Sequence, residues 1–303
     1  MRADRLPLSF SVMLVLGGPP AVLSAETRTV ALVVTDEQGA FVPDLRADEV
    51  RVLENGAACE IASFEKDERP LCVALVLDAS DEAVRIFRGE AIPAVQAFLA
   101  RLPPRSRCTL WTTGDRARKL GELKGDPAAI EKTVARGFAG GNNMLLDTLV
   151  EAADALGGES DRRRALVAVT GRAPGHTSWS PGDVTSRVRR AGARVFGVFY
   201  REGAPGGVGS LSGFAVPRDV VNLTAVGEGD HQRILNGLAQ GTGGRFELVG
   251  TATAVSRLLD AFAAELGGQY RVRFAVADAK GPKKIEARVT RPGLHWRVAI
   301  DSP

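Results

Sequence analysis

Cysteine and histidine are scarce in this chain of 303 residues, with three of each. The spacing of Cys59, Cys72 and Cys108 matches no zinc-binding motif, and no histidine lies near any of them. We therefore expect buried, unligated thiols rather than a metal centre. An odd number of cysteines leaves at least one unpaired. A Cys72–Cys108 disulfide remains an open alternative because both residues begin predicted strands.

A large excess of charge is also lacking. Lys and Arg number 39 against 36 Asp and Glu, which gives a formal net charge of +3. Nucleic-acid binding needs a concentrated basic face, so no nucleic-acid partner is predicted. The densest basic cluster is Arg162-Arg163-Arg164, directly before an apolar run. We expect it to be a solvated loop leading into a strand rather than a phosphate site.

A second long apolar run is absent after the first 25 residues. Within residues 1–25, Arg2 and Arg5 precede the apolar stretch 6–16, and a Gly-Gly-Pro-Pro break and small residues follow. This order is typical of a secretory signal peptide, and the apolar stretch is too short for a bilayer anchor. We expect cleavage after residue 25, with the mature protein secreted or periplasmic and without a membrane anchor.

The chain does contain a clear change of pattern along its length. Residues 26–68 and 269–303 alternate apolar and polar side chains in short runs, which is typical of half-buried strands. Residues 69–268 instead alternate continuous apolar runs with helical segments, which predicts parallel βαβ units. The predicted fold class is α/β, with a doubly wound, mostly parallel, Rossmann-like sheet. We expect the N- and C-terminal segments to pack together in a small β-sandwich-like module, because neither could bury its apolar face alone.

A candidate binding edge lies where the first central strand ends, in the run Asp78-Ala79-Ser80-Asp81-Glu82. In doubly wound sheets, ligands bind at the carboxyl ends of the strands near the point where strand order reverses. A carboxylate and a hydroxyl two residues apart at such an edge can hold a hard cation such as Mg²⁺.

With these residues the chain resembles the von Willebrand factor type A (VWA)-related domain family of secreted bacterial proteins. In that family the first strand ends in a DxSxS metal motif, matched here by Asp78 and Ser80, with Glu82 in the last place. Asn143 stands where the family has threonine, and Gly171 stands where an acidic residue is expected. Residues 241–246 and 269–293 also look similar. The resemblance covers nearly all of residues 27–300 and implies a VWA-like fold with a degenerate metal-ion-dependent adhesion site.

The resemblance further implies protein–protein interaction rather than catalysis, with an unidentified protein partner in the cell envelope or outside the cell. The expected binding edge consists of Asp78, Ser80, Glu82, Asn143 and Gly171, extended by a long surface loop at 203–230. No catalytic residue and no cofactor is predicted, apart from weak binding of Mg²⁺ or Ca²⁺ by the first four of these residues. The missing acidic group would have oriented the metal-bound water, and such losses lower metal affinity by about 10–100-fold.

Two alternatives stay open. Gly209-Ser210-Leu211-Ser212-Gly213 matches the G-x-S-x-G motif of serine hydrolases, with His231 and either Asp219 or Asp230 as candidate partners. The predicted strand and helix that must flank such a motif are missing, however. A metal-dependent hydrolase is the other enzyme alternative. Either enzyme needs its reacting groups within hydrogen-bond reach of each other inside a pocket, and the structure can be examined for this geometry. The second alternative is a structural component of an envelope assembly.

Overall fold

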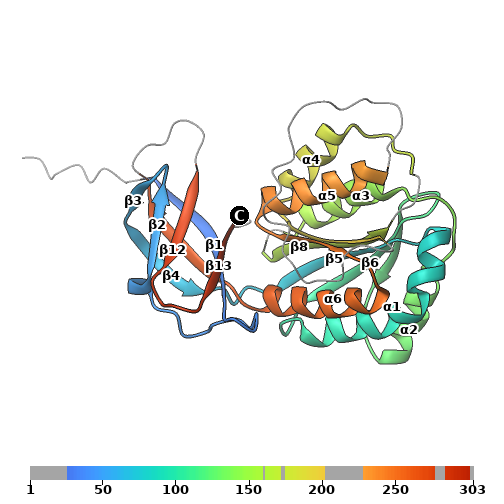
Figure 1. Cartoon of the computed structure of the whole chain (residues 1–303), viewed down its shortest axis with the longest axis horizontal. Coiled ribbons are helices and arrows are strands. Elements are labelled where there is room, and N and C mark those ends of the chain that lie inside the picture. The colour runs from blue at the N-terminus through green and yellow to red at the C-terminus, as the bar shows by residue number, and fades with distance from the viewer. Residues whose placement is uncertain (1–25, 160, 172–174, 202–227, 277–283, 301–303) are drawn as a thin grey trace, which may run out of the picture.

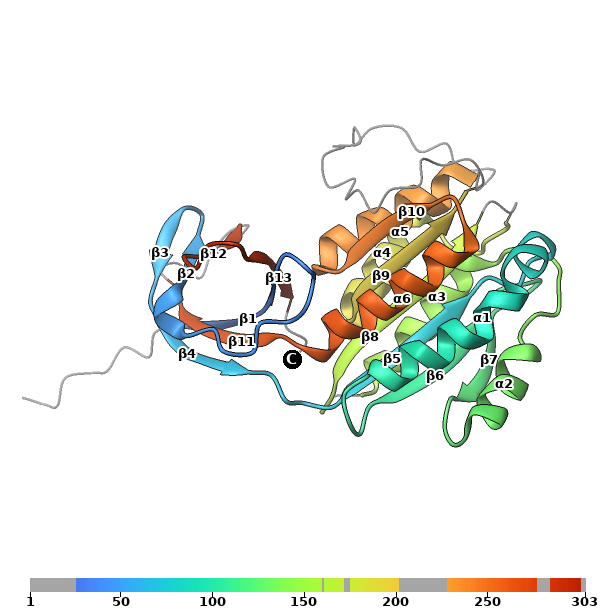
Figure 2. The same ribbon diagram turned by 60° about the horizontal axis from the view of Figure 1, so that its bottom comes forward.

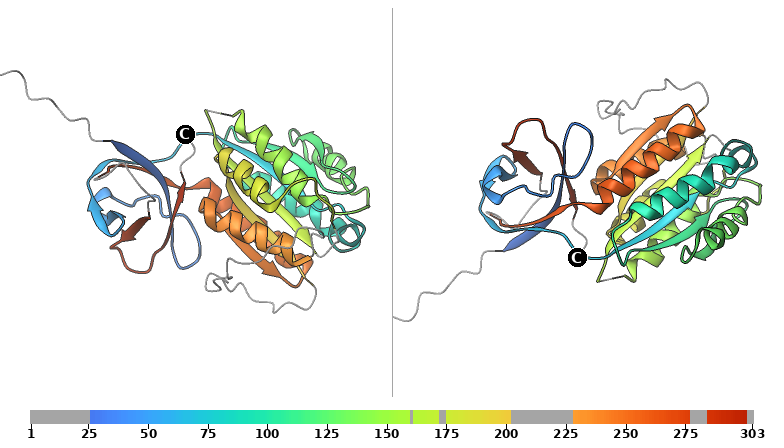
Figure 3. Two further views of the ribbon diagram at one scale, coloured as in Figure 1. Left: turned by 90° about the horizontal axis from the view of Figure 1, so that it is seen from above. Right: turned by 90° about the horizontal axis from the view of Figure 1, so that it is seen from below.

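The computed structural model describes residues 26–159, 161–171, 175–201, 228–276 and 284–300. The predicted signal peptide and the G-x-S-x-G segment lie outside these ranges. Figure 1 shows a β-strand module beside a larger α/β domain, and both views in Figure 3 show them at opposite ends of the molecule. In the described part of the chain, no helix is long and apolar enough to cross a membrane.

A six-stranded sheet forms the centre of the α/β domain, in the order β10-β9-β8-β5-β6-β7. All neighbours are parallel except β6 and β7, which are antiparallel. The predicted doubly wound, mostly parallel sheet is therefore confirmed. The strands are β5 (Leu71–Leu77), β6 (Arg107–Thr112), β7 (Arg118–Glu122), β8 (Arg163–Gly171), β9 (Arg194–Tyr200) and β10 (Arg245–Val249).

Helices cover both faces of this sheet, as Figure 2 shows. Every residue of β5, β8 and β9 is buried, because alternate side chains enter two separate apolar cores. One core is closed by α1 (Asp81–Arg101), α2 (Pro127–Ala135) and α6 (Ala252–Gly267). The other is closed by α3 (Leu145–Gly157), α4 (Pro181–Arg190) and α5 (Glu228–Thr242).

The chain's two ends build the β-strand module together, as predicted. One sheet has the order β13-β1-β11-β4 and the other the order β12-β2-β3. Apolar side chains from both segments are buried in the shared core, among them Val30, Leu32, Val50, Val52, Val272 and Phe274. A short 3-10 turn, Ala47–Glu49, precedes β2. The strands are β1 (Thr27–Thr35), β2 (Val50–Glu54), β3 (Ala57–Cys59), β4 (Ile61–Lys66), β11 (Tyr270–Ala275), β12 (Ile285–Val289) and β13 (His295–Ile300).

The alternative of a Cys72–Cys108 disulfide is wrong, because all three cysteines are free. Cys72 lies opposite Arg107 in the β5–β6 ladder, and Cys108 lies opposite Val73. Successive side chains of a strand point to opposite faces, so one residue of offset separates the two thiols across the sheet. Cys72 accordingly packs in the core under α3–α5, whereas Cys108 packs in the core under α1, α2 and α6.

A buried polar network joins the β-strand module to the α/β domain. Arg194, at the start of β9, donates to Glu265 of α6 at 2.6 Å and to Gln269 at 2.9 Å. Arg297 of β13 forms a second ion pair with Glu265. Gln269 in turn donates to Asp67 at 2.7 Å, just before the linker into β5. We call these five residues the junction network.

Burial and hydrogen bonds shift the pKa values of two residues in the junction network, Arg194 and Asp67. Burial lowers the pKa of Arg194 to about 10, and the Glu265 carboxylate opposes that effect, so the guanidinium stays charged at neutral pH. Burial also raises the pKa of the Asp67 carboxyl, but hydrogen bonds from Arg69 and Gln269 outweigh it and hold the pKa below its usual value. At neutral pH the network therefore contains a charged Arg194 guanidinium and a charged Asp67 carboxylate.

The expectation of a solvated Arg162–Arg164 loop is wrong for two of the three arginines. Arg163 and Arg164 are buried, with 5% and 7% of their surface exposed. Arg163 donates to the backbone carbonyls of Arg69 and Leu266, and Arg164 donates to that of Ala191. These side chains satisfy carbonyls where helices and the linker end, which a run of like charges in the sequence does not reveal.

Candidate functional site

Asp78 lies directly after β5, beside the point where strand order reverses, and only 2% of its surface is exposed. Its Oδ1 accepts hydrogen bonds from the Ser80 backbone N–H at 2.9 Å and the Thr113 hydroxyl at 3.3 Å. Its Oδ2 accepts from Asn143 Nδ2 at 2.8 Å, the Thr170 hydroxyl at 2.9 Å and the Gly171 backbone N–H at 3.1 Å. A carboxylate has about four lone-pair sites, so these donors occupy all of its accepting capacity.

Asn143 precedes α3 and is completely buried. Its amide nitrogen donates to both Asp78 and the Thr170 hydroxyl, the latter at 2.9 Å. The reverse orientation would place the amide oxygen against a carboxylate oxygen, so the donor contacts fix which atom is the nitrogen. The Asn143 Oδ1 atom has no hydrogen-bond partner among the described residues. Asn143 thus presents a donor to Asp78, and its oxygen is left unpaired.

The other predicted site residues lie at the same edge of the sheet. Ser80 is the N-cap of α1, and its hydroxyl accepts from the Ala83 backbone N–H at 3.4 Å. Glu82, in the first turn of α1, lines a narrow crevice together with Asp78, Ser80 and Gly171. The fold therefore brings together all five residues that the sequence nominated, four around one crevice and Asn143 through its bond to Asp78.

Two residues of this site were missed by the sequence analysis. Thr113 directly follows β6 and Thr170 lies near the end of β8, and both are almost fully buried. Each hydroxyl donates to a different oxygen of Asp78. Their position in the sequence could have identified them. Both lie at the carboxyl ends of the strands that flank β5, and the carboxyl ends of parallel neighbours meet at the same edge of the sheet.

Protein donors compete with any cation for the Asp78 oxygens. Metal ions need free lone pairs on oxygen, and those of Asp78 already accept protein hydrogen bonds. Two other carboxylates nearby each accept a backbone hydrogen bond on one oxygen: Asp81 accepts from the Gly141 N–H at 3.0 Å, and Asp115 accepts from the Asn142 N–H at 3.1 Å. Within the described ranges, no group of three or more His, Cys, Asp or Glu side chains could hold a metal ion.

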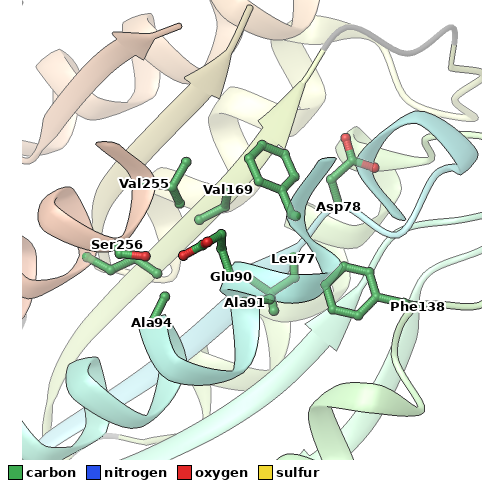
Figure 4. Close-up of a pocket in the computed structure, with 11 residues that line it drawn as sticks. Leu77, Asp78, Glu90, Ala91, Ala94, Phe138, Val169, Val255 and Ser256 are labelled. Atoms are coloured by element: carbon green, nitrogen blue, oxygen red, sulfur yellow. The ribbon is translucent and has the colours of Figure 1, made fainter. Parts of the chain in front are cut away.

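The pocket next to Asp78 is apolar and small. Figure 4 shows it between α1 and α6, with Val169 and Val255 on one side and Phe138 on the other. The polar side chains Glu90 and Ser256 lie apart from the Asp78 carboxylate in this view. The cavity has a volume of about 20 Å³, which is room for about one water molecule. It offers no space for a substrate.

His231 and Asp230 are the described members of the hydrolase alternative. His231 is the one of the two that is nearly fully buried. It is 1% exposed, and its Nδ1 has no hydrogen-bond partner among the described residues. Burial lowers the pKa of its imidazole, although Asp78 and Asp230 act in the opposite direction. A Cβ on Gly175 would lie 3.1 Å from His231 Nε2, so the ring packs closely against that backbone. The motif serines and Asp219 lie outside the described residues.

Comparison with solved structures gives likenesses to VWA domains. A von Willebrand factor type A protein from Catenulispora acidiphila is 10% identical, with a TM-score of 0.47, over 92% of this chain and 74% of that one. The SpRpn10 VWA domain is 15% identical, with a TM-score of 0.44, over 65% and 98%. Proximal thread matrix protein 1 from the mussel byssus, with a zinc-occupied MIDAS motif, is 13% identical, with a TM-score of 0.45, over 68% and 49%.

These likenesses concern the fold alone. The chain spans about half of the mussel protein. No protein-family model and no curated protein sequence matches the chain.

Proposed function

We propose that this protein is an exported VWA-type binding module that recognises a protein partner through its loop edge without a bridging metal ion. The observation that carries the proposal is the state of Asp78, whose carboxylate is fully occupied by five protein donors. Such a carboxylate is stabilised in place and has no lone pair left for a cation or for proton transfer. The edge is then a fixed polar surface rather than a reactive site.

The surface that a partner would contact is formed by neighbouring residues of the same edge. Asp81, Asp115 and Asn142 are exposed, and Glu82 is half-buried. Hydrogen bonds from the 141–142 backbone to Asp81 and Asp115 hold these loops together. A preorganised surface loses less entropy on binding than a flexible one, which favours recognition by these loops. An extracytoplasmic location, secreted or periplasmic, is part of the proposal and rests on the predicted signal peptide.

Metal titration tests the first half of the proposal. Calorimetry of the mature protein with Mg²⁺ and Ca²⁺ should give no saturable binding, or weak binding only. The triple variant Glu82→Ser, Asn143→Thr, Gly171→Asp should bind at least tenfold more tightly, because it removes the Asn143 amide donor to Asp78 and moves a carboxylate from position 82 to position 171, beside Asp78. The Gly171 substitution is accommodated, since a Cβ there meets nothing closer than 3.5 Å. Micromolar Mg²⁺ binding to the unaltered protein, lost in Asp78→Ala, would overturn the proposal.

Partner capture tests the second half. The mature protein, immobilised and incubated with envelope extract, should retain the same partner with chelator and with Mg²⁺ present. Glu82→Arg should abolish capture, whereas the matched charge reversal Glu131→Arg, on an exposed position of α2, should not. Capture that needs the cation, or that survives Glu82→Arg, contradicts recognition at this edge.

A further inference from the structure

The sequence contains two Asn-Gly pairs, and the structure places them in different backbone environments. Asn55-Gly56 forms the turn between β2 and β3 in the β-strand module, whereas Asn236-Gly237 lies inside α5. In an Asn-Gly pair the backbone nitrogen of glycine can approach the asparagine side chain closely, because glycine has no Cβ in the way. The two pairs therefore share their local chemistry and differ in the structure around them.

The Asn55-Gly56 turn is exposed and open. Asn55 has a φ of 51° and Gly56 a φ of 86°, as in the type I′ turn that this dipeptide favours in two-residue hairpins. A Cβ on Gly56 would meet nothing within 4 Å, and the Gly56 N–H donates to no group in the described part of the chain. Only the tip of the hairpin has to open for the Gly56 nitrogen to turn toward the Asn55 side chain.

The side-chain carbonyl of Asn55 is polarised by its neighbour at the start of β12. Asn55 Oδ1 accepts from the Lys284 backbone N–H at 3.0 Å, and the Asn55 N–H donates to the Lys284 carbonyl at 2.8 Å. A donor on Oδ1 withdraws electron density from Cγ and stabilises the negative charge that develops on this oxygen when a nucleophile adds. The Asn55 Nδ2 group makes no hydrogen bond with any described residue, so it is free to leave into solvent.

Asn236-Gly237 is held in the opposite way. Within an α-helix the Gly237 N–H donates to the carbonyl four residues earlier, so its nitrogen is already engaged. Asn236 Oδ1 accepts from Gln240 Nε2 at 3.3 Å, one turn further along. The flanking Leu235 and Leu238 are 0% and 1% exposed. Turning the Gly237 nitrogen toward the Asn236 side chain would therefore break a packed helix in its middle.

We propose that Asn55 is a site of spontaneous modification, at which the chain's own backbone converts asparagine into aspartate and isoaspartate. The Gly56 nitrogen gives its proton to solvent and bonds to Asn55 Cγ, the Cγ–Nδ2 bond breaks, and ammonia leaves, which closes a succinimide ring. Water then opens this ring. Addition of water at Cγ gives aspartate in the ordinary backbone, and addition at the Asn55 main-chain carbonyl gives isoaspartate. The net reaction consumes water and releases ammonia, with no oxidation or reduction.

The modification would act on the pairing between the two ends of the chain. Residue 55 links β2, from the N-terminal segment, to β12, from the C-terminal segment, through its two bonds with Lys284. Isoaspartate lengthens the backbone by a methylene group, so it disturbs the register that a two-residue turn imposes. Both products also add a negative charge. This inference is separate from partner recognition at the Asp78 edge, because it concerns the β-strand module at the other end of the molecule.

Peptide mapping by mass spectrometry tests the proposal on the intact mature protein, incubated at mildly alkaline pH. Asn55 should be converted about tenfold faster than Asn236 or more, because a hairpin tip opens far more often than the middle of a packed helix. Incubation in urea is the matched control: without the fold, the two pairs should react at similar rates. The Asn55 peptide should yield both aspartate and isoaspartate, which have the same mass and separate by chromatography.

Asn55→Gly removes the side-chain amide and keeps a residue suited to the left-handed turn. This variant should show no conversion in its hairpin peptide, while the rate at Asn236 stays unchanged. Equal rates at Asn55 and Asn236 in the folded protein, or a faster rate at Asn236, would overturn the proposal. Aspartate without isoaspartate at Asn55 would refute the succinimide route.

Discussion

Glu265 provides the sharpest test of the structure, because it is the single acid in contact with two arginines of the junction network. It is 5% exposed and accepts from Arg194 at 2.6 Å, and Arg297 pairs with it from the β-strand module. Glu265→Gln keeps the shape but removes the charge, which leaves Arg194 buried without its counter-ion. Breaking a buried ion pair from one side costs about 3–5 kcal/mol.

That loss is large enough to measure directly. For a domain of this size, about 1 kcal/mol shifts Tm by roughly 2–4 °C, so Glu265→Gln should lower Tm by about 10 °C. Urea unfolding of the mature protein, followed by circular dichroism, gives the free energy. The matched control is Asp260→Asn on the same helix, which removes the exposed Arg101–Asp260 pair and should cost less than about 1 kcal/mol. Equal losses in the two variants would refute the proposed role of the junction network.

Three further predictions concern single residues. Because the pKa of Asp67 is held below its usual 3.8, its stabilisation is complete above that pH and is lost as pH falls through the folded value. Asp67→Asn should therefore flatten the acid limb of the unfolding free energy against pH. Native thiol labelling should modify only the half-buried Cys59, since burial raises the pKa of Cys72 to about 11 and Cys108 is also buried, and all three should react in urea. Gly244→Ala should cost about 3 kcal/mol in urea unfolding, because its Cβ would overlap the backbone of β9, and near-native stability would contradict that packing.

Much of the fold followed from pattern alone. The continuous apolar run of β5 predicted a strand buried on both faces, and the alternation of 26–68 and 269–303 predicted one shared β module. The antiparallel strand β7 was missed, because its sequence Arg-Lys-Leu-Gly-Glu has little apolar alternation and pairs only at the edge of the sheet. Edge strands depend on their neighbour's hydrogen bonds more than on their own side chains, so composition predicts them poorly.

The site was predictable in position but not in bonding. Strand ends placed Asp78 and Gly171 at one edge, since parallel neighbours must end together. Asn143 was expected as a weak metal ligand through its side-chain oxygen, and the structure shows its nitrogen bonded to Asp78. An asparagine side chain offers both a donor and an acceptor, and only the acceptor oxygens of its neighbour Asp78 decide which one faces inward. Similarly, the arginines at 163 and 164 face carbonyls at the ends of helices and the linker that are distant in sequence.

The donors around Asp78 explain how a buried carboxylate is stable at this edge. A buried charge is costly unless it is paired or hydrogen-bonded. Asn143 stands where the related metal motif has threonine, and its amide donates an N–H to Asp78. Gly171 stands where that motif has an acid. It brings no second negative charge, and its backbone N–H donates to Asp78. Restoring the acid alone would place two carboxylates together with no counter-charge, and restoring the threonine alone would remove one donor. The departures from the metal motif are therefore mutually dependent, because both give the Asp78 carboxylate a donor.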